Sequence, residues 1–400
     1  MQLRKIWGGV FLIAGTSIGG GMLGLPIVTA AGGIVYSSVL LLLAWALMTI
    51  TALYTLEVNL AFPNHSNIIT MVSGTLGRPG VLICWTIYIL FLYSLLAMYI
   101  SGGQDLLRGL ASTISIHLPI WLSAVVFVGV FGWIVMRGTR NVDRFNRFFM
   151  TLKLVTLFIL IVLILMHTSL PTTEGHWRAL APAVTATITS FGFSIIVPSL
   201  RTYFGGDVKV LRRVIILGSL LPLVCYIIWD GVIFAAIPLH GPDSLLAIMN
   251  SNQPLSNLLH SLNHIMHSEA IKSFSSLFTS VCVLTAFLCV SLGLSDYVAD
   301  GVGQRKQGRG LWIVAALTFL PPLVCVILYP KAFIFFLGFA GLLCVILQAF
   351  MPALMAWRVR YHQKRELPYR VAGGRPLLLL SMAGAILVVI IALSQYAIGR

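Results

Sequence analysis

The chain has 400 residues, of which 58% are hydrophobic and 9% are charged, and its mean hydropathy is +0.97. Soluble domains carry about 25% charged residues, so these values exclude a soluble enzyme and indicate a protein embedded in a lipid bilayer. Lys and Arg number 26 against 11 Asp and Glu, a net charge of +15 that membrane proteins concentrate in cytoplasmic loops, so it does not require a nucleic-acid partner. The six cysteines fall in apolar stretches, which excludes a secreted disulfide scaffold.

The hydrophobic segments predict eleven membrane-spanning helices, because a helix that crosses a bilayer needs ~20 mostly apolar residues. The first five spans run over 6–31, 34–60, 80–103, 119–136 and 143–167. The second five run over 180–200, 211–237, 270–300, 311–329 and 332–357, and one further span covers 376–397. The first segment is too long for the apolar core of a signal peptide, so we expect it to remain in the protein. The predicted fold class is therefore an all-α integral membrane protein.

The positive charges predict the orientation of these spans. With the N-terminus in the cytoplasm, 21 of the 26 Lys and Arg residues lie on the cytoplasmic side. The other five are Arg108, Arg178, Lys272, Lys331 and Arg400. Because cytoplasmic loops carry the excess of Lys and Arg, this skew favours eleven spans, with the C-terminus on the opposite side.

The longest external connection, 240–268, contains the segment LSNLLHSLNHIMHS. Its apolar residues recur at helical spacing, which predicts a short amphipathic helix that lies on the outer face. His260, His264 and His267 share one side of this helix, a spacing that could also hold a metal ion. No Cys or carboxylate accompanies them, so we favour an amphipathic cover with solvated imidazoles and expect no metal.

The first span contains an unusual run of glycines in the segment AGTSIGGGMLGLP, residues 14–26. Each glycine in a helix interior costs ~1 kcal/mol relative to alanine. Unwound backbone at mid-depth is tolerated only where it lines a cavity or is buried in protein. The run therefore predicts a broken helix, and close helix packing through small residues is the alternative.

A second segment of the same kind, TSFGFSIIVP at 189–198, lies in the sixth span. Gly192 precedes Pro198 by six residues, just as Gly20 precedes Pro26. Two broken helices, each at the start of five spans, are typical of an inverted repeat, because five is odd and the second set enters the membrane from the opposite side. We expect a first repeat at 1–167, a second repeat at 180–357 and an eleventh span at 376–397.

The geometry of a broken helix predicts the chemistry of the site. Carbonyls just before a break suit an ammonium group, and N–H groups just after it suit a carboxylate. In the first span the carbonyls belong to Ala14, Gly15, Thr16 and Ser17, and the N–H donors belong to Gly19, Gly20, Gly21 and Met22. In the sixth span Thr189 and Ser190 precede Phe191, Gly192 and Phe193. These residues form the candidate site for a zwitterionic solute.

Aromatic residues near this centre indicate which side chain the site prefers. Phe191 and Phe193 flank the second break, and Tyr93 and Tyr99 lie in the third span. An aromatic ligand could find edge-to-face partners there. We take Tyr93 as the candidate contact from the third span. Tyr99 lies near the outer interface, where a place in the aromatic belt is the alternative to ligand contact.

Over almost its whole length the sequence resembles the hydroxy and aromatic amino acid permease family. The matching stretches are AGTSIGGGMLGLP (14–26), WALMTITALYTLEVNL (45–60), AMYISGG (97–103), SFGF (190–193), LGLSDYVAD (292–300), FLPP (319–322) and YRVAGGRP (369–376). The resemblance implies the five-plus-five inverted-repeat fold of leucine-type symporters, with helices 1 and 6 discontinuous. It also implies proton-coupled uptake of an aromatic amino acid, L-tyrosine above all, across a bacterial inner membrane. The chain departs from the family pattern at Ser194, where we expect a His, and at Asp230, where we expect a neutral residue.

Ionisable residues at depth are costly and are therefore candidates for ion coupling. Lys153 lies five residues beyond Phe148, or ~7.5 Å along the helix, so its amine could snorkel to the cytoplasmic interface. The alternative comes from the resemblance, because in related carriers that lack sodium a fifth-span lysine occupies the place of the sodium ion. Ser291 and Ser295, one turn apart in the eighth span, could complete an ion or proton site at the first break, or could bond back to their own helix.

Acidic residues in the predicted spans also need partners. Glu57, Asp296 and Asp300 lie toward the inner ends of their spans, where we expect structural ion pairs or an inner gate, with proton carriage as the alternative. Asp230 lies deeper, and we expect it to be neutral, to pair with a distant hydroxyl or to face an outer vestibule.

Together these features predict a secondary transporter that alternates access to a mid-membrane site, with the proton as the coupling ion. A tryptophan or general aromatic carrier, or an exchanger, is the nearest alternative, and a membrane-embedded channel or enzyme is the alternative from another class. No HExxH or P-loop motif indicates an enzyme, and no filter-like loop or charged ring indicates a channel. The expected partners are the amino acid, protons and lipid, with no nucleic acid, obligate protein partner, cofactor or metal.

Overall fold

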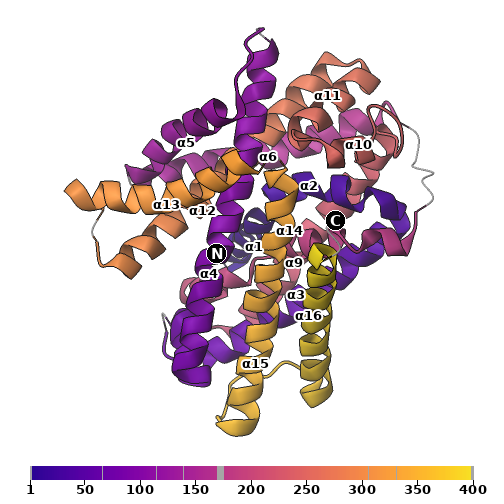
Figure 1. The fold of residues 1–400 in the computed structure, drawn as a ribbon. Coiled ribbons are helices and arrows are strands. Elements are labelled where there is room, and N and C mark those ends of the chain that lie inside the picture. The colour runs from indigo at the N-terminus through magenta and orange to yellow at the C-terminus, as the bar shows by residue number, and fades with distance from the viewer. Residues whose placement is uncertain are drawn as a thin grey trace.

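A computed structural model describes residues 2–64, 66–113, 115–137, 139–168, 175–304, 306–329 and 331–397. These residues form helices and connecting segments with no strand among them, which confirms the all-α class (Figure 1). The first half of the chain contains α1 (Gln2–Ser17), α2 (Gly20–Thr29), η1 (Ala30–Gly32), α3 (Gly33–Leu60), α4 (Ile68–Thr113), α5 (Ile120–Met136) and α6 (Thr139–Leu165). The middle contains η2 (Trp177–Leu180), α7 (Ala183–Ser190), η3 (Ser194–Ile196), α8 (Val197–Phe204), α9 (Val208–Ala236), α10 (Leu245–Asn250) and α11 (Pro254–Met266). The last part contains α12 (Glu269–Val302), α13 (Gly308–Leu328), α14 (Ala332–Cys344), η4 (Val345–Phe350), α15 (Met351–Trp357), η5 (Arg358–His362) and α16 (Gly374–Ala397).

The helices are apolar on their outer surface as well as in the core. Phe158, Leu328 and Leu380 are 70%, 76% and 68% exposed, which suits lipid contact and not water. Within the described ranges, nine helical stretches are apolar and long enough to cross a membrane, and α5 is a shorter apolar helix of 17 residues. This is the composition of a multi-pass membrane protein.

Two spans extend further than the sequence predicts. The third span, expected over 80–103, is the long helix α4, which begins at Ile68 and is kinked at Gly77. The φ of Gly77 is +71° and Pro79 follows, so the chain bends there and a short helical segment joins the span. The tenth span, expected to end at 357, continues through the π-helical segments η4 and η5 to His362.

The connection between α9 and α12 folds into two short helices where we expected one. Helices α10 and α11 lie together near the top of Figure 1, and α15 lies near the bottom. Leu255, Leu258 and Leu262 lie on the buried face of α11, as expected of an amphipathic cover. His264 lies 3.0 Å from a carboxylate oxygen of Asp243. Among the described residues, no three His, Cys, Asp or Glu side chains gather closely enough to hold a metal ion.

The long helices pack in pairs around the short ones. Helix α6 lies along α12 and α4 lies along α14, while α9 packs against both α1 and α3. Helix α7 packs against both α2 and α14. Gly341 permits the second contact, because a Cβ at this position would stand only 1.9 Å from the carbonyl oxygen of Thr185. The broken first and sixth spans are therefore surrounded by longer helices.

Glu57 and Asp230 both have hydrogen-bond partners in the interior. The carboxylate of Glu57 accepts two hydrogen bonds from the guanidinium of Arg360 and one from the N–H of Val371, all in the interior. This ion pair joins α3 to the end of the tenth span. Asp230 in α9 is fully buried, and one of its oxygens accepts a hydrogen bond of 2.9 Å from the hydroxyl of Thr29. Pairing with a distant hydroxyl is one of the three expected environments for this residue.

Candidate functional site

The first span is broken near its middle, where α1 ends at Ser17 and α2 begins at Gly20. Gly19 has an extended backbone, with φ −148° and ψ −152°, that lies outside both helices. The N–H of Ile18 still bonds to the carbonyl of Ala14 at 2.7 Å, which is the last bond of the α1 pattern. The glycine run therefore interrupts the helix at the predicted place.

The sixth span is broken over a longer stretch. Helix α7 ends at Ser190 and α8 begins at Val197, with only the single turn η3 between residues 194 and 196. Gly192 lies in the unwound part, where a Cβ would stand 3.1 Å from the Cys344 sulfur of α14. Both breaks leave backbone N–H and carbonyl groups without the partners that a continuous helix would provide.

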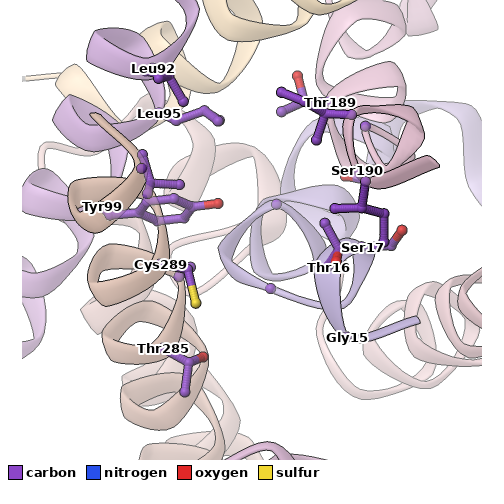
Figure 2. Close-up of a pocket in the computed structure, with 18 of the residues that line it drawn as sticks. Gly15, Thr16, Ser17, Leu92, Leu95, Tyr99, Thr189, Ser190, Thr285 and Cys289 are labelled. Atoms are coloured by element: carbon purple, nitrogen blue, oxygen red, sulfur yellow. The ribbon is translucent and has the colours of Figure 1, made fainter. Parts of the chain in front are cut away.

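A cavity of about 440 Å³ lies between the two breaks and the helices α4, α6 and α12 (Figure 2). The broken spans contribute Leu12, Gly15, Thr16, Ser17, Gly19, Gly21, Thr189, Ser190, Gly192, Ile195 and Ile196. The surrounding helices contribute Tyr88, Phe91, Leu92, Leu95 and Tyr99 from α4, Met150 and Lys153 from α6, and Thr285, Ala286, Cys289, Val290 and Gly293 from α12. Figure 2 shows Tyr99 and Cys289 on one side of this space and Ser17 and Ser190 on the other.

Eight of the predicted backbone-site residues line this cavity. They are Gly15, Thr16, Ser17, Gly19 and Gly21 of the first break and Thr189, Ser190 and Gly192 of the second. The hydroxyl of Ser17 is buried, and it has no hydrogen-bond partner among the described residues. It is therefore available to a ligand.

Three predicted residues of the first span do not line the cavity. Ala14 and Met22 are buried in the apolar core, because the helices on either side of the break turn these positions away from the opening. Gly20 lies under the ring of Tyr99, and a Cβ on Gly20 would stand 2.5 Å from that ring. The glycine is therefore needed for close approach of an aromatic side chain and not for direct exposure to the cavity.

The two phenylalanines of the second break also lie away from the cavity, which corrects the expected ligand contact. The ring of Phe191 packs against Tyr226 of α9, with 5.2 Å between ring centroids. Phe193 belongs to a separate apolar cluster that includes Ile13 and Leu200. Both phenylalanines are fully buried. They anchor the unwound segment by hydrophobic packing, which local sequence does not reveal.

Helix α4 presents Tyr99 to the cavity and not Tyr93, which corrects a second expectation. The hydroxyl of Tyr93 donates a hydrogen bond of 2.7 Å to the carbonyl of Leu317 in α13. Tyr99 lines the cavity, so its place in an aromatic belt is also wrong. The lining residues at 88, 92, 95 and 99 recur at the three- and four-residue spacing of one helix face, and this spacing excludes position 93.

Helix α12 turns a different face to the first break than we expected. Thr285 and Ala286 line the cavity, whereas Ser291 and Ser295 do not. The hydroxyls of both serines donate to carbonyls of their own helix, at 2.5 and 2.8 Å, which is the alternative that the sequence left open. Five residues separate Ala286 from Ser291, a rotation of about 140° around the helix axis, so the two cannot share a face.

Lys153 reaches the first break from α6. Its side chain is 2% exposed, and its amine donates a hydrogen bond to the carbonyl oxygen of Ile18, between α1 and α2. The amine therefore does not extend to a membrane interface, and the snorkelling alternative is wrong. Among the described lining residues Lys153 is the one charged side chain, and the others are apolar or neutral polar.

The fold and the site together define a class of protein. The chain is helical and apolar on its outer surface, and at its centre it holds a cavity lined by two unwound backbone segments and a buried amine. Discontinuous helices around a central site are the arrangement of membrane transporters.

Comparison with known proteins gives the family. The sequence matches the tryptophan/tyrosine permease family over residues 2–392, and the chain belongs to this family. This result confirms the resemblance stated above. Because the relatives are transport systems and permeases, the protein is a transporter and not an enzyme.

Three relatives illustrate the range of the similarity. The chain is 31% identical to tyrosine-specific transport system 2 of Haemophilus influenzae, over 98% of this chain and 97% of that protein. It is 30% identical to the tryptophan-specific transport protein of Pseudomonas aeruginosa, over 94% and 91% of the two chains. It is also 30% identical to glutamine transporter 2 of Aliivibrio fischeri, over 96% and 98%.

Solved structures show a similar fold at low sequence identity. A manganese transporter of Eremococcus coleocola, in complex with an aromatic bis-isothiourea compound, superimposes with a TM-score of 0.59 at 11% identity, over 98% of this chain and 85% of that one. A mutant of the same manganese transporter gives a TM-score of 0.61 at 13% identity, over 97% and 85%. The likeness concerns the arrangement of the helices.

Proposed function

We propose that the protein imports an aromatic amino acid, L-tyrosine above all, by symport with protons and with alternating access to the central cavity. The contact between the Lys153 amine and the carbonyl of Ile18 carries this proposal, because it places a proton-binding group against the unwound backbone that would hold the substrate. Relatives named for tyrosine and for tryptophan support the substrate class.

The two breaks suit the charged ends of an amino acid. The N–H groups at the start of α2 lie at the positive end of a helix dipole, where a carboxylate is stabilised. The unpaired hydroxyl of Ser17 and the phenol of Tyr99 lie beside them and can donate further hydrogen bonds. The last carbonyls of α1 and α7 lie at the negative ends of their helices and suit the ammonium group.

The side chain of the substrate would lie against α4. Tyr88, Phe91 and Tyr99 offer aromatic rings to the cavity, and edge-to-face contacts between such rings add about 1 kcal/mol each beyond hydrophobic burial. The cavity volume of about 440 Å³ lies within the range of small-molecule sites. Tryptophan has the same aromatic character and is the second candidate, supported by the tryptophan-specific relatives.

Lys153 is the proposed coupling residue. While it is protonated, its amine forms a charge-assisted hydrogen bond that ties α6 to the first break. Loss of the proton leaves a weaker, neutral bond, so the unwound segment and α1 become free to move. The state of one proton would thereby control the position of the helix that contributes the backbone site.

We further propose that 1–167 and 180–357 are inverted repeats, followed by an eleventh span at 376–397. Helices α1 and α2 then form the first span, and α7 and α8 form the sixth. In this repeat α4, α5 and α6 of the first half correspond to α12, α13 and α14 of the second half. Three contacts each have a counterpart when the halves are exchanged, which supports the repeat. The contact of α6 with α12 corresponds to that of α14 with α4, the contact of α4 with α5 to that of α12 with α13, and the contact of α13 with α4 to that of α5 with α12.

The skew of Lys and Arg supports a cytoplasmic N-terminus and a periplasmic C-terminus in a bacterial inner membrane. A single cysteine placed in the 240–268 connection of a chain lacking other cysteines would test this orientation. We expect a membrane-impermeant thiol reagent to label it from the periplasm of intact cells. Labelling only after the cells are opened would contradict the orientation.

Uptake by the purified protein in proteoliposomes tests the function. We expect labelled tyrosine to accumulate above its external concentration when an inward proton gradient is imposed, and to stop accumulating when a protonophore removes the gradient. A sodium gradient alone should give no accumulation. Competition by unlabelled tryptophan, phenylalanine and glutamine then ranks the substrates. Accumulation driven by sodium, or preferential uptake of glutamine, would contradict the proposal.

A further inference from the structure

The tenth span borders the second break on both sides. Before the break, the hydroxyl of Thr189 donates a hydrogen bond of 3.0 Å to the carbonyl of Leu337 in α14. After the break, the N–H and the hydroxyl of Ser194 both donate to the amide oxygen of Gln348, at 3.0 and 2.9 Å. The unwound segment between these residues is therefore attached to one neighbouring helix at each of its ends.

Gln348 is an unusual residue for the interior of a membrane protein. Its side chain is 1% exposed, and it lies in the π-helical segment η4. Such segments insert an extra residue into a helix and occur frequently at functional sites. The amide nitrogen is buried and has no hydrogen-bond partner among the described residues. It lies 3.4 Å from the place where a Cβ on Gly192 would stand, and Gly192 lines the cavity.

The same arrangement occurs at the first break with different chemistry. There Lys153, from the fifth span, donates to the carbonyl of Ile18. Here Gln348, from the tenth span, accepts from Ser194. In the inverted repeat proposed above, the fifth and tenth spans are equivalent, so each break is held by one polar side chain from the last span of its own repeat. The first side chain can exchange a proton, and the second is a neutral amide.

We propose that Gln348 is a positioning residue of the substrate site, which keeps the second break unwound through its two hydrogen bonds to Ser194. The N–H of Ser194 begins a short 3-10 turn and has no helical partner, so it needs an acceptor from elsewhere. Without the amide oxygen, the segment 191–194 shifts toward a continuous helix that satisfies its own backbone. The carbonyls at the end of α7 and the exposed backbone of Gly192 then leave the cavity wall.

This inference rests on the proposed function for its transport readout, and Gln348→Met tests it. Methionine has nearly the same length as glutamine but accepts no strong hydrogen bond. We expect the KM for tyrosine uptake to rise about tenfold with a smaller change in kcat, because the loss of a buried acceptor weakens the form of the break that binds substrate. Ser194→Ala removes one of the two donors and should raise the KM less.

A matched control lies elsewhere in the same protein. Gln104 in α4 is also buried, 3% exposed, and its amide oxygen accepts a hydrogen bond of 3.2 Å from the hydroxyl of Ser123 in α5. This pair lies at neither break. Gln104→Met should therefore leave the KM within about twofold of the native value, even if it lowers thermal stability as much as Gln348→Met does. An equal rise in KM in both variants would indicate a general loss of stability and would overturn the proposal.

Two further measurements separate this inference from the proposed function. The effects of Gln348→Met and Ser194→Ala should not add in the double variant, because both remove the same contact. The rate of amide hydrogen exchange, measured without substrate, should fall about tenfold at residues 190–196 in Gln348→Met, because the segment shifts toward a continuous helix. The rate should stay unchanged at residues 15–22 of the first break. Additive effects, or exchange that changes equally at both breaks, would overturn the positioning role. If the native protein takes up no tyrosine, the proposed function fails, and the exchange experiment still decides the role of Gln348.

Discussion

The amine of Lys153 and the carbonyl oxygen of Ile18 are joined by a hydrogen bond at the point where α1 gives way to α2. A buried ammonium group needs acceptors, and a carbonyl inside a continuous helix is already bonded to an N–H four residues ahead. The break removes that competition, so the unwound backbone itself supplies the partner of the cation. The same break provides the backbone groups that would hold an amino acid, so the proposed substrate and proton sites share one stretch of chain.

Replacement of Lys153 by alanine tests the coupling role. We expect Lys153→Ala to abolish accumulation of tyrosine driven by a proton gradient, because the group proposed to exchange the proton is gone. Tyrosine binding should remain detectable, since the backbone groups of both breaks are still present. Proteoliposome uptake measures the first effect, and exchange of labelled for unlabelled tyrosine across the membrane measures the second.

Thr156 provides the control for this variant. It lies one turn further along α6 and is 1% exposed, and among the described residues its hydroxyl bonds only to carbonyls of its own helix, at 2.8 and 3.1 Å. Thr156→Val should keep gradient-driven accumulation. Unchanged accumulation in Lys153→Ala would remove Lys153 from the coupling mechanism.

The two tyrosines of α4 allow a paired test of the substrate site. Tyr99→Phe keeps the ring that packs over Gly20 but removes the hydroxyl that faces the cavity. A hydrogen bond to a charged group contributes ~1.5 kcal/mol or more, so the KM for tyrosine should rise about tenfold. Tyr93→Phe removes a hydroxyl that bonds to Leu317 away from the cavity and should leave the KM unchanged. The reverse result would place Tyr93 at the substrate.

The two breaks were predictable from the sequence because their cause is local. Glycines at 19–21 and at 192 weaken the helix where they stand, and the prolines at 26 and 198 mark the same spacing in both spans. The depth of Lys153 was not predictable to the same degree. A lysine in the cytoplasmic half of a predicted span can either extend to the interface or turn inward. The carbonyl of Ile18, in the break between α1 and α2, decides between these outcomes, because it supplies an acceptor in the interior.

The orientation of side chains around each helix was the part that sequence could not supply. Ser291 and Thr285 both lie near the middle of α12, and which of them faces the cavity depends on how the helix is rotated against its neighbours. Phe191 adjoins the break in sequence, but it packs against Tyr226, which belongs to the next long helix of the chain. These contacts are set by packing between helices that are distant in sequence, so no local sequence pattern predicts them.

The buried ion pair between Glu57 and Arg360 should contribute strongly to stability. Glu57→Gln leaves the guanidinium of Arg360 buried without a countercharge, and loss of one partner of such a pair costs about 3 kcal/mol or more. We expect a lower midpoint of thermal unfolding in detergent. Glu269 pairs with Lys272 in solvent, with side chains 84% and 49% exposed, so Glu269→Gln should leave the midpoint unchanged. Equal midpoints for the two variants would show that the interior pair is not a major source of stability.

The contact between α7 and α14 depends on the absence of a side chain at Gly341. A Cβ there would stand 1.9 Å from the carbonyl oxygen of Thr185, so Gly341→Ala must push α7 away from α14. Overpacking of this kind costs about 1–3 kcal/mol. Since α7 ends at Ser190 on the cavity wall, the variant should also raise the KM for tyrosine.

Gly129 in α5 is the matched control for this substitution, because a Cβ there meets no atom of the described residues within 4 Å. Alanine favours a helix interior over glycine by ~1 kcal/mol, so Gly129→Ala should keep or raise the midpoint of thermal unfolding and leave the KM unchanged. The two variants add the same methyl group to a helix, and they differ in what that group meets. A native midpoint and a native KM in Gly341→Ala would mean that α7 can move away from α14 at no cost, and the tight contact would then have no part in holding the second break beside the cavity.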